Sequence, residues 1–144
     1  MCLTISSNKT TKEFFQRLTK AGKRGILAYK IYSLGPFDRL YSPYFHKSQQ
    51  IKPGIVISDR KNKCLENEEE LCSEVYKGIH VFMSSRDASR LVSNGQTVVA
   101  VKVRKDDLVA VGHWDESSHP SSAVFMKVEM SKKEYWKTLG FIDI

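Results

Sequence analysis

Two histidines and two carboxylates stand close together in the second half of the chain, a composition that could bind a metal ion. The segment reads His113-Trp114-Asp115-Glu116-Ser117-Ser118-His119. Imidazole and carboxylate are common ligands of divalent metals, but this spacing matches no helical or hairpin ligand pair, and no cysteine is near. We therefore interpret the segment as part of a long polar loop over 112–122 and predict no metal site.

A further histidine, His80, stands inside the apolar run Ile79-His80-Val81-Phe82-Met83. Side chains alternate along a strand, so if Val81 and Met83 face the core, His80 and Phe82 line the opposite face. That face could form a pocket. A lone histidine in a strand is more often structural than a general base, and we interpret His80 in this way.

Aromatic rings and cations are interleaved in the segment that follows Arg39, which reads Leu40-Tyr41-Ser42-Pro43-Tyr44-Phe45-His46-Lys47. Rings stack on bases while cations meet phosphate, as recognition of a nucleotide or a single strand requires. The alternative is that the rings fill the edge of the core. With the basic loop near residue 60, the candidate binding residues are Arg39, Tyr41, Tyr44, His46, Lys47, Arg60, Lys61 and Lys63.

The net charge of +7 is concentrated in the first half of the chain. Residues 1–63 contain thirteen lysines and arginines against three acids, whereas residues 64–76 contain five glutamates and no cation. Such an excess attracts nucleic acid or an acidic protein surface, and the attraction weakens with salt. The alternative is a solvated, lysine-rich surface that only keeps the protein in solution.

The cysteines and the N-terminal residues indicate in which cellular compartment the protein is expected. Cys2, Cys64 and Cys72 are an odd set without a Cys-x-x-Cys pair, which argues against a zinc site and a disulfide framework. Cys2 could be an N-terminal nucleophile after removal of Met1, but the polar residues downstream do not indicate a buried terminus. No apolar run suits a membrane span or a signal peptide, so we expect a protein that is neither membrane-bound nor secreted.

Four apolar runs rich in Val, Ile and Phe predict a sheet that would position these residues. They cover 79–83, 97–103, 108–111 and 123–130, and a further strand is expected over 26–32, ending at the Gly35-Pro36 turn. We expect an extended loop over 40–53 and a short strand over 55–57. Strands of this kind, with few helices, are typical of a mostly antiparallel sheet.

Three helices are expected around the sheet. The first covers about 11–21, with Thr10 as its cap, Glu13 completing a capping box and Gly22 as its end. Ser85 is expected to cap a short helix over 86–92, and Ser131 to open a last one. The sequence therefore predicts a single α+β domain over residues 1–144, with a mostly antiparallel sheet and two or three short helices.

Five short motifs follow one another along most of the chain. In this order they resemble a family of small proteins from phages, large DNA viruses and gut bacteria whose chains begin Met-Cys-Leu. The resemblance implies a viral or accessory setting and no particular activity. The motifs are Met1-Cys2-Leu3-Thr4-Ile5, Ala28-Tyr29-Lys30, Leu40-Tyr41-Ser42-Pro43-Tyr44, Tyr76-Lys77-Gly78-Ile79-His80-Val81-Phe82 and Ala123-Val124-Phe125-Met126-Lys127.

A second set of residues is similar to ADP-ribosyltransferase-like folds, in which residues on two strands and a late carboxylate hold NAD. Tyr29 or Lys30, then Ser84-Ser85, then Glu129 occupy the corresponding places. The chain has no early His or Arg at the expected place, no Ser-Thr-Ser triplet and no Glu-x-Glu pair. The resemblance implies an NAD-using enzyme with Tyr29, Ser84 and Glu129 as candidate catalytic residues and His80 as a further one.

The function we expect is that of a small basic binding or accessory protein rather than an enzyme. It would engage an acidic protein surface, nucleic acid or a nucleotide through the candidate binding residues, and would need no cofactor. Two alternatives stay open: the NAD-using transferase, and a minor structural component of a virion or another large assembly. We expect the protein in the host cytoplasm or in a virion.

Overall fold

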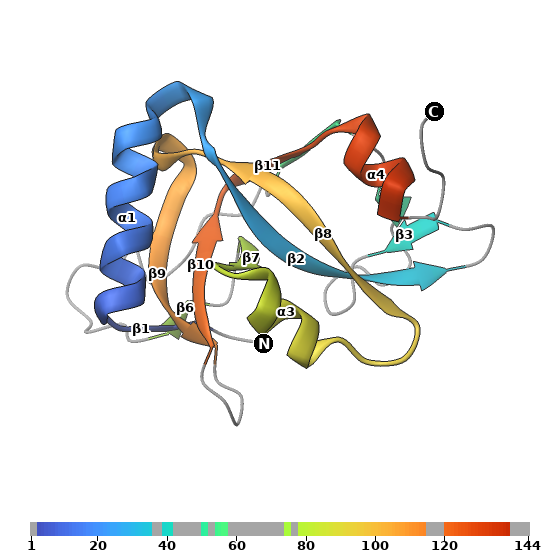
Figure 1. Cartoon of the computed structure of the whole chain (residues 1–144), viewed down its shortest axis with the longest axis horizontal. Coiled ribbons are helices and arrows are strands. Elements are labelled where there is room, and N and C mark those ends of the chain that lie inside the picture. Colours follow the sequence, from blue (N-terminus) through green and yellow to red (C-terminus); the bar gives the residue numbers. More distant parts are fainter. Residues whose placement is uncertain are drawn as a thin grey trace.

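An antiparallel sheet forms the frame of the protein, and helices pack against it (Figure 1). The computed structural model describes residues 3–35, 39–41, 50–51, 54–57, 74–75, 78–114 and 120–138. Neighbouring strands in these ranges are antiparallel throughout. Their order is β5 (Gly54–Ile57), β11 (Lys127–Met130), β8 (Gln96–Val103), β2 (Ile26–Gly35), β7 (Ile79–Phe82), β10 (Ser121–Phe125), β9 (Leu108–Trp114), β1 (Leu3–Ile5) and β6 (Glu74–Val75).

The remaining elements complete an α+β domain. β3 (Arg39–Tyr41) extends the sheet beside β2, and β4 (Gln50–Ile51) pairs with β3. The expected fold class, a single α+β domain with a mostly antiparallel sheet, is confirmed. The described helices are α1 (Lys9–Ala21), α3 (Ser85–Leu91) and α4 (Lys132–Thr138), with short 3-10 turns η1 (Gly22–Arg24) and η2 (Lys105–Asp107).

A bend at Met126 divides the long strand that the sequence predicts over 123–130. That prediction is wrong in one respect, because β10 pairs with β7 and β9 whereas β11 pairs with β8 and β5. The backbone N–H of Met126 donates to the carbonyl of Asp107 at 2.7 Å, which holds the corner. The row β11-β8-β2-β7-β10 is thereby curled around an interior, since its two end strands are consecutive in the chain.

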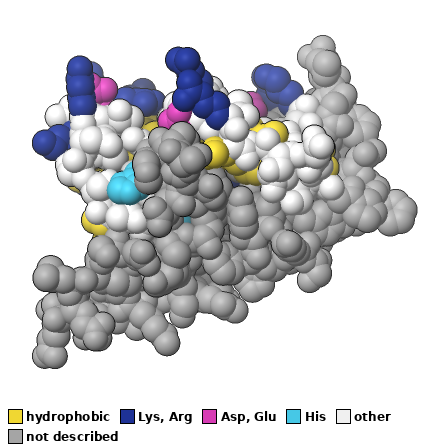
Figure 2. Space-filling view, turned by 90° about the horizontal axis from the view of Figure 1, so that it is seen from below, with side chains coloured by type: hydrophobic (Ala, Val, Ile, Leu, Met, Phe, Trp, Pro, Cys, Tyr) yellow, Lys and Arg dark blue, Asp and Glu magenta, His cyan; other side chains and the backbone are white. Residues whose placement is uncertain are grey.

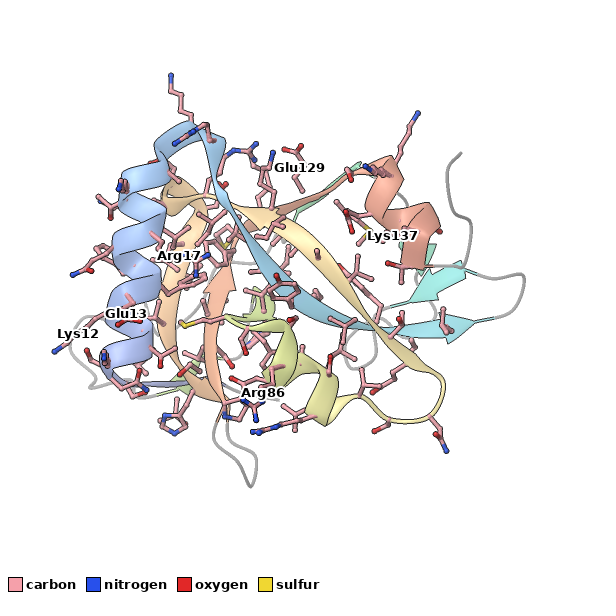
Figure 3. The ribbon with its side chains drawn as sticks, viewed as in Figure 1. Lys12, Glu13, Arg17, Arg86, Glu129 and Lys137 are labelled. Carbon is pink, nitrogen blue, oxygen red and sulfur yellow. The ribbon has the colours of Figure 1, made fainter. Side chains whose placement is uncertain are left out.

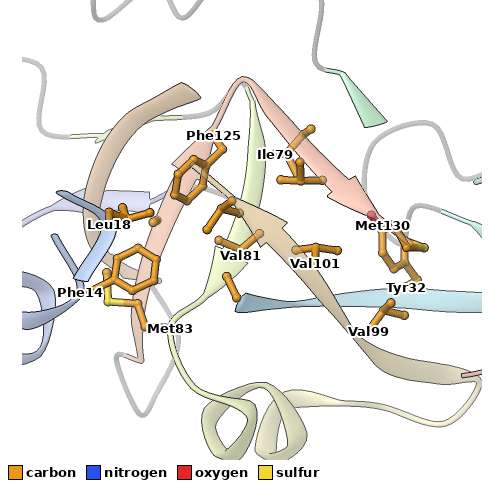
Figure 4. Packing of buried hydrophobic residues seen from close by; sticks show 14 of the residues in the cluster. Phe14, Leu18, Tyr32, Ile79, Val81, Met83, Val99, Val101, Phe125 and Met130 are labelled. Atoms are coloured by element: carbon orange, nitrogen blue, oxygen red, sulfur yellow. The ribbon is translucent and has the colours of Figure 1, made fainter. Parts of the chain in front are cut away.

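The interior of the curled sheet is apolar and closely packed (Figure 4). Phe14 and Leu18 of α1 close it at one end, and Tyr135 of α4 packs against it as well. The Phe14 ring meets Phe125 of β10 edge to face, with 6.4 Å between the ring centroids. Truncating a fully buried side chain such as Leu18 to alanine is expected to cost about 2–5 kcal/mol of stability.

The outer side of the sheet has a smaller core under α3. Ile31, Phe82 and Ala88 are buried there, with Tyr29 packed against them. Val81 and Met83 belong to the interior, so the predicted division of β7 into two faces is confirmed.

The helix caps differ from the predicted ones by one or two residues. Asn8, not Thr10, caps α1: the Thr11 N–H donates to Asn8 Oδ1 at 2.9 Å, and the Asn8 N–H donates to Thr11 Oγ1 at 2.8 Å. Thr11 is buried, so the reciprocal pair forms two residues earlier than the box with Glu13 would require. Gly22 ends the helix with a φ of 57°, as expected.

The caps of the other two helices also lie at or next to the predicted residues. Ser84 caps α3 in place of Ser85, because the Asp87 N–H donates to Ser84 Oγ at 3.1 Å. Ser131 opens α4 as predicted, and its Oγ accepts from the Glu134 N–H at 3.1 Å.

β9 is longer than predicted and continues to Trp114, so His113 and Trp114 lie in a strand rather than in the expected loop. The reason is β1, which pairs with residues 112–114 and gives this part of the backbone a partner. The predictions for Cys2, Cys64 and Cys72 lie outside the described residues.

We predict that Gly112→Ala is strongly destabilising, because an added Cβ would collide with the carbonyl oxygen of Thr4 in β1. Overpacking of this kind typically costs about 1–3 kcal/mol. Gly22→Ala is the control, since nothing lies within 4 Å of a Cβ there and only its left-handed φ is strained. Urea unfolding should show the larger loss for Gly112→Ala; equal losses would mean that β1 is not pressed against β9.

Candidate functional site

The exposed side of α1, with η1, carries more cations than any other helix in the described part of the chain. Helical spacing places Lys9, Lys12 and Lys20 away from Phe14 and Leu18, which are buried, and Arg17 beside that face. Two further cations follow in η1. All six are exposed, and Glu13 is the one carboxylate among them. We call this surface the basic edge; it consists of Lys9, Lys12, Arg17, Lys20, Lys23 and Arg24.

The position of Lys9 is not explained by helix stability. It is the first helical residue, and the first turn contains no acidic side chain. The N-terminus of a helix favours anions, so a cation there costs about 0.3–1 kcal/mol. Lys20, in the last turn, is favoured by the same dipole. The cations therefore extend along the whole helix, including the end where they oppose its formation.

Contacts from η2 and the end of β8 fix the basic edge on the sheet. Arg104 Nε donates to the Lys23 carbonyl at 2.8 Å, and the Arg104 guanidinium pairs with Glu129 at 2.9 Å. Lys105 Nζ lies 5.2 Å from the ring centroid of Phe15 on α1. The edge is thus held as part of the folded domain.

Other described cations are more scattered. In Figure 2 the lysine and arginine side chains stand in separate groups, with some acidic side chains beside them. Figure 3 shows Lys12 pointing away from the sheet, Arg86 on α3 and Lys137 on α4. α3 has two arginines with Asp87, and α4 has three lysines with Glu134, so neither matches the basic edge.

The binding residues predicted from the sequence lie largely outside the described ranges. Arg39 and Tyr41 belong to β3, whose backbone pairs with the end of β2. Tyr44, His46, Lys47, Arg60, Lys61 and Lys63 fall in ranges that the structure does not describe.

The residues of the NAD-using alternative occupy two parts of the sheet. Tyr29 is opposite Phe82 of β7 and packs beneath α3. The Ser84 hydroxyl caps α3. Glu129 is on β11, with β8 between it and β2, and it pairs with Arg104.

His80 lies nearer to Tyr29 than Glu129 does in the order of the sheet, because β7 adjoins β2. Its imidazole is on the outer side, and its carbonyl oxygen accepts from Lys30 Nζ at 3.2 Å. Tyr29 and Ser84 are thus brought near β7 and α3, whereas Glu129 is held elsewhere by an ion pair.

Lys30 occupies an unusual place for a lysine. Ala28 and Tyr32 belong to the interior and Tyr29 and Ile31 to the outer side, so alternation directs the Lys30 side chain inward. Besides its bond to the His80 carbonyl, Nζ lies 5.5 Å from the Tyr32 ring centroid. The side chain keeps partial exposure. It lies where the pairing of β2 with β7, found at Tyr29 and Phe82, gives way to the pairing with β3.

The interior changes the acid–base behaviour of both polar groups on this stretch of β2. Burial lowers the pKa of Lys30 from 10.5 to about 8. Burial also raises the pKa of Tyr32. The Tyr32 side chain is fully buried, and its hydroxyl has no hydrogen-bond partner among the described residues. In those residues the ion pair is that of Arg104 with Glu129, so Lys30 has no carboxylate partner there.

A serine–histidine pair joins β1 to β9. Ser6 Oγ lies 2.9 Å from His113 Nδ1, and both side chains are partly buried. A hydroxyl beside an imidazole is the pair used in nucleophilic catalysis, but such catalysis also needs an orienting acid and an oxyanion site. In the described ranges, no group of three or more His, Cys, Asp or Glu residues could hold a metal ion.

Sequence reasoning missed the basic edge and Lys30. The signal for the edge was present, because Lys9, Lys12 and Lys20 all avoid the helix face of Phe14 and Leu18. For Lys30, a lysine in the middle of an apolar run on the side of Ala28 and Tyr32 was the available sign.

Comparison with protein-family models, curated proteins and solved structures finds no match for this chain. Within the described residues, no helix has both the length and the apolar character that crossing a membrane requires.

The lowered pKa of Lys30 predicts a pH-dependent stability. The folded amine has a pKa of about 8 and the unfolded one its ordinary value of 10.5, so the unfolded chain binds more protons between these pH values. Stability contributed by this group therefore rises with pH across that window. Between pH 7 and 9.5 we expect Tm to rise by roughly 3–6 °C more in the native chain than in Lys30→Met.

Lys30→Met also removes the hydrogen bond to the His80 carbonyl, which lowers Tm by the same amount at every pH. Comparing how steeply Tm rises with pH in the two chains cancels this constant loss. Parallel curves of Tm against pH for the two chains would show that the amine is not desolvated in the fold.

Proposed function

We propose that this protein binds nucleic acid through the basic edge, by contact with the phosphate backbone and without sequence preference. The observation that carries the proposal is the set of six exposed cations against one carboxylate along α1 and η1. Cations in this arrangement release counterions from a nucleic acid on binding, which supplies affinity independent of base sequence.

The make-up of the basic edge favours nucleic acid over an acidic protein. Stable protein interfaces have an apolar centre with aromatic anchors, whereas interfaces with nucleic acid are polar and strongly positive. Along α1 the exposed large apolar side chain is Phe15, and Lys105 lies over its ring. The apolar face of the helix is buried, so it is not available to a membrane or a partner helix.

The proposal also covers where the protein acts. The resemblance to proteins of phages and large DNA viruses suggests a viral or accessory role in the host cytoplasm or in a virion, where nucleic acid is the most abundant polyanion.

Binding to a fluorescent DNA oligonucleotide tests the proposal, with two sets of variants of equal charge change. Lys12→Gln, Lys20→Gln and Lys23→Gln together remove three cations from the basic edge, and Lys132→Gln, Lys133→Gln and Lys137→Gln remove three around α4. All six residues are exposed, so each set should fold. For the native chain, about four phosphate contacts predict an affinity loss of roughly 100-fold between 50 and 200 mM salt.

The basic-edge variant should bind more weakly, with a salt slope smaller by about 2–3, while the α4 variant keeps the native slope. Equal effects of the two sets would mean that net charge, not this surface, attracts DNA. If polyglutamate binds as tightly as DNA, the proposal is wrong, and an acidic protein is the better candidate for the partner.

A further inference from the structure

The amine of Lys30 differs in its surroundings from those of the basic edge. Its stem enters the interior of the curled sheet, and its nitrogen contacts the His80 carbonyl and the Tyr32 ring. Lys30 as a residue is only partly buried, so solvent reaches part of it. No part of the proposed nucleic-acid surface uses this group.

The groups that face Lys30 do not stabilise a positive charge well. From the strands and helices that enclose the interior, the titratable side chains are Tyr32 of β2 and Tyr135 of α4, and the rest of the buried cluster is apolar. One neutral carbonyl at 3.2 Å and the face of the Tyr32 ring at 5.5 Å replace the water that normally surrounds an ammonium, and neither carries a negative charge. Lysines desolvated in apolar pockets are the ones that act as amine nucleophiles.

We propose that Lys30 is a carbonyl-reactive amine, a site at which a small aldehyde forms a Schiff base. The lone pair of the neutral Nζ forms a bond with the aldehyde carbon and gives a carbinolamine. The carbinolamine then loses its oxygen as water, taking both protons of the amine, and a C=N bond remains. Atoms and electrons balance without an oxidant or reductant.

The packing around Lys30 limits the aldehyde to a small, uncharged one. Ala28 and Tyr32 are fully buried on either side of Lys30 along β2, and Val81 of β7 is nearly so. An aldehyde carrying a charged group would have to place that group among apolar side chains, which is unfavourable without a partner.

Competitive labelling of the native chain with propanal tests the proposal. The reaction is run at pH 7.5 with limiting propanal and cyanoborohydride, which traps each Schiff base as a propyl amine, and peptide mapping reads every lysine. With a pKa near 8 about a quarter of the amine is neutral, against about one part in a thousand for an amine at 10.5. We therefore expect Lys30 to react at least tenfold faster than Lys102.

Lys102 is the matched control because it is also partly buried in a central strand, with its side chain on the outer side of the sheet. Tyr32→Phe keeps the ring beside the amine and should leave the labelling of Lys30 unchanged. A rate at Lys30 less than tenfold that at Lys102 in the native chain overturns the proposal, and this readout needs no variant to fold.

Discussion

The chain leaves β10 at Phe125 and, after the single residue Met126, begins β11 beside a different set of strands. Because both halves of this bent strand are hydrogen-bonded, the strands between them must curl around a common interior. Side chains of β2, β7 and β8 fill that interior, and α1 can close it only by burying Phe14 and Leu18. The outward position of the cations on α1 follows from this packing.

Two chemical environments result from one packing arrangement. Outside, α1 and η1 present cations to water, where charge acts over long distances and is screened by salt. Inside, Lys30 and Tyr32 extend from β2 among apolar side chains, where burial lowers the pKa of the amine and raises that of the phenol. The His80 carbonyl and the Tyr32 ring partly compensate the amine for lost water. Lysine therefore has two roles in this protein: at the surface it attracts polyanions, and in the interior it provides a nucleophilic amine.

The apolar runs predicted most of the strands, because β-branched content and turn residues are local signals. The division of β7 into two faces followed from alternation alone. The break at Met126 could not be predicted, since it is set by which distant strands pair with each half. The same holds for the pairing of β1 that extends β9 to Trp114, and for the cap at Asn8, which depends on the burial of Thr11. The basic edge could have been predicted from the spacing of the cations along α1. The contact of Lys30 with His80 could not, because it joins residues far apart in the chain.

The central claim is that the curled sheet encloses an interior poor in water that includes the amine of Lys30. NMR titration of the Lys30 side chain, followed at its terminal carbon and nitrogen in an isotope-labelled chain, tests this most directly. The account predicts a titration midpoint near 8. A midpoint for Lys30 at the ordinary value of 10.5 would contradict it, because the amine would then be hydrated as on any surface.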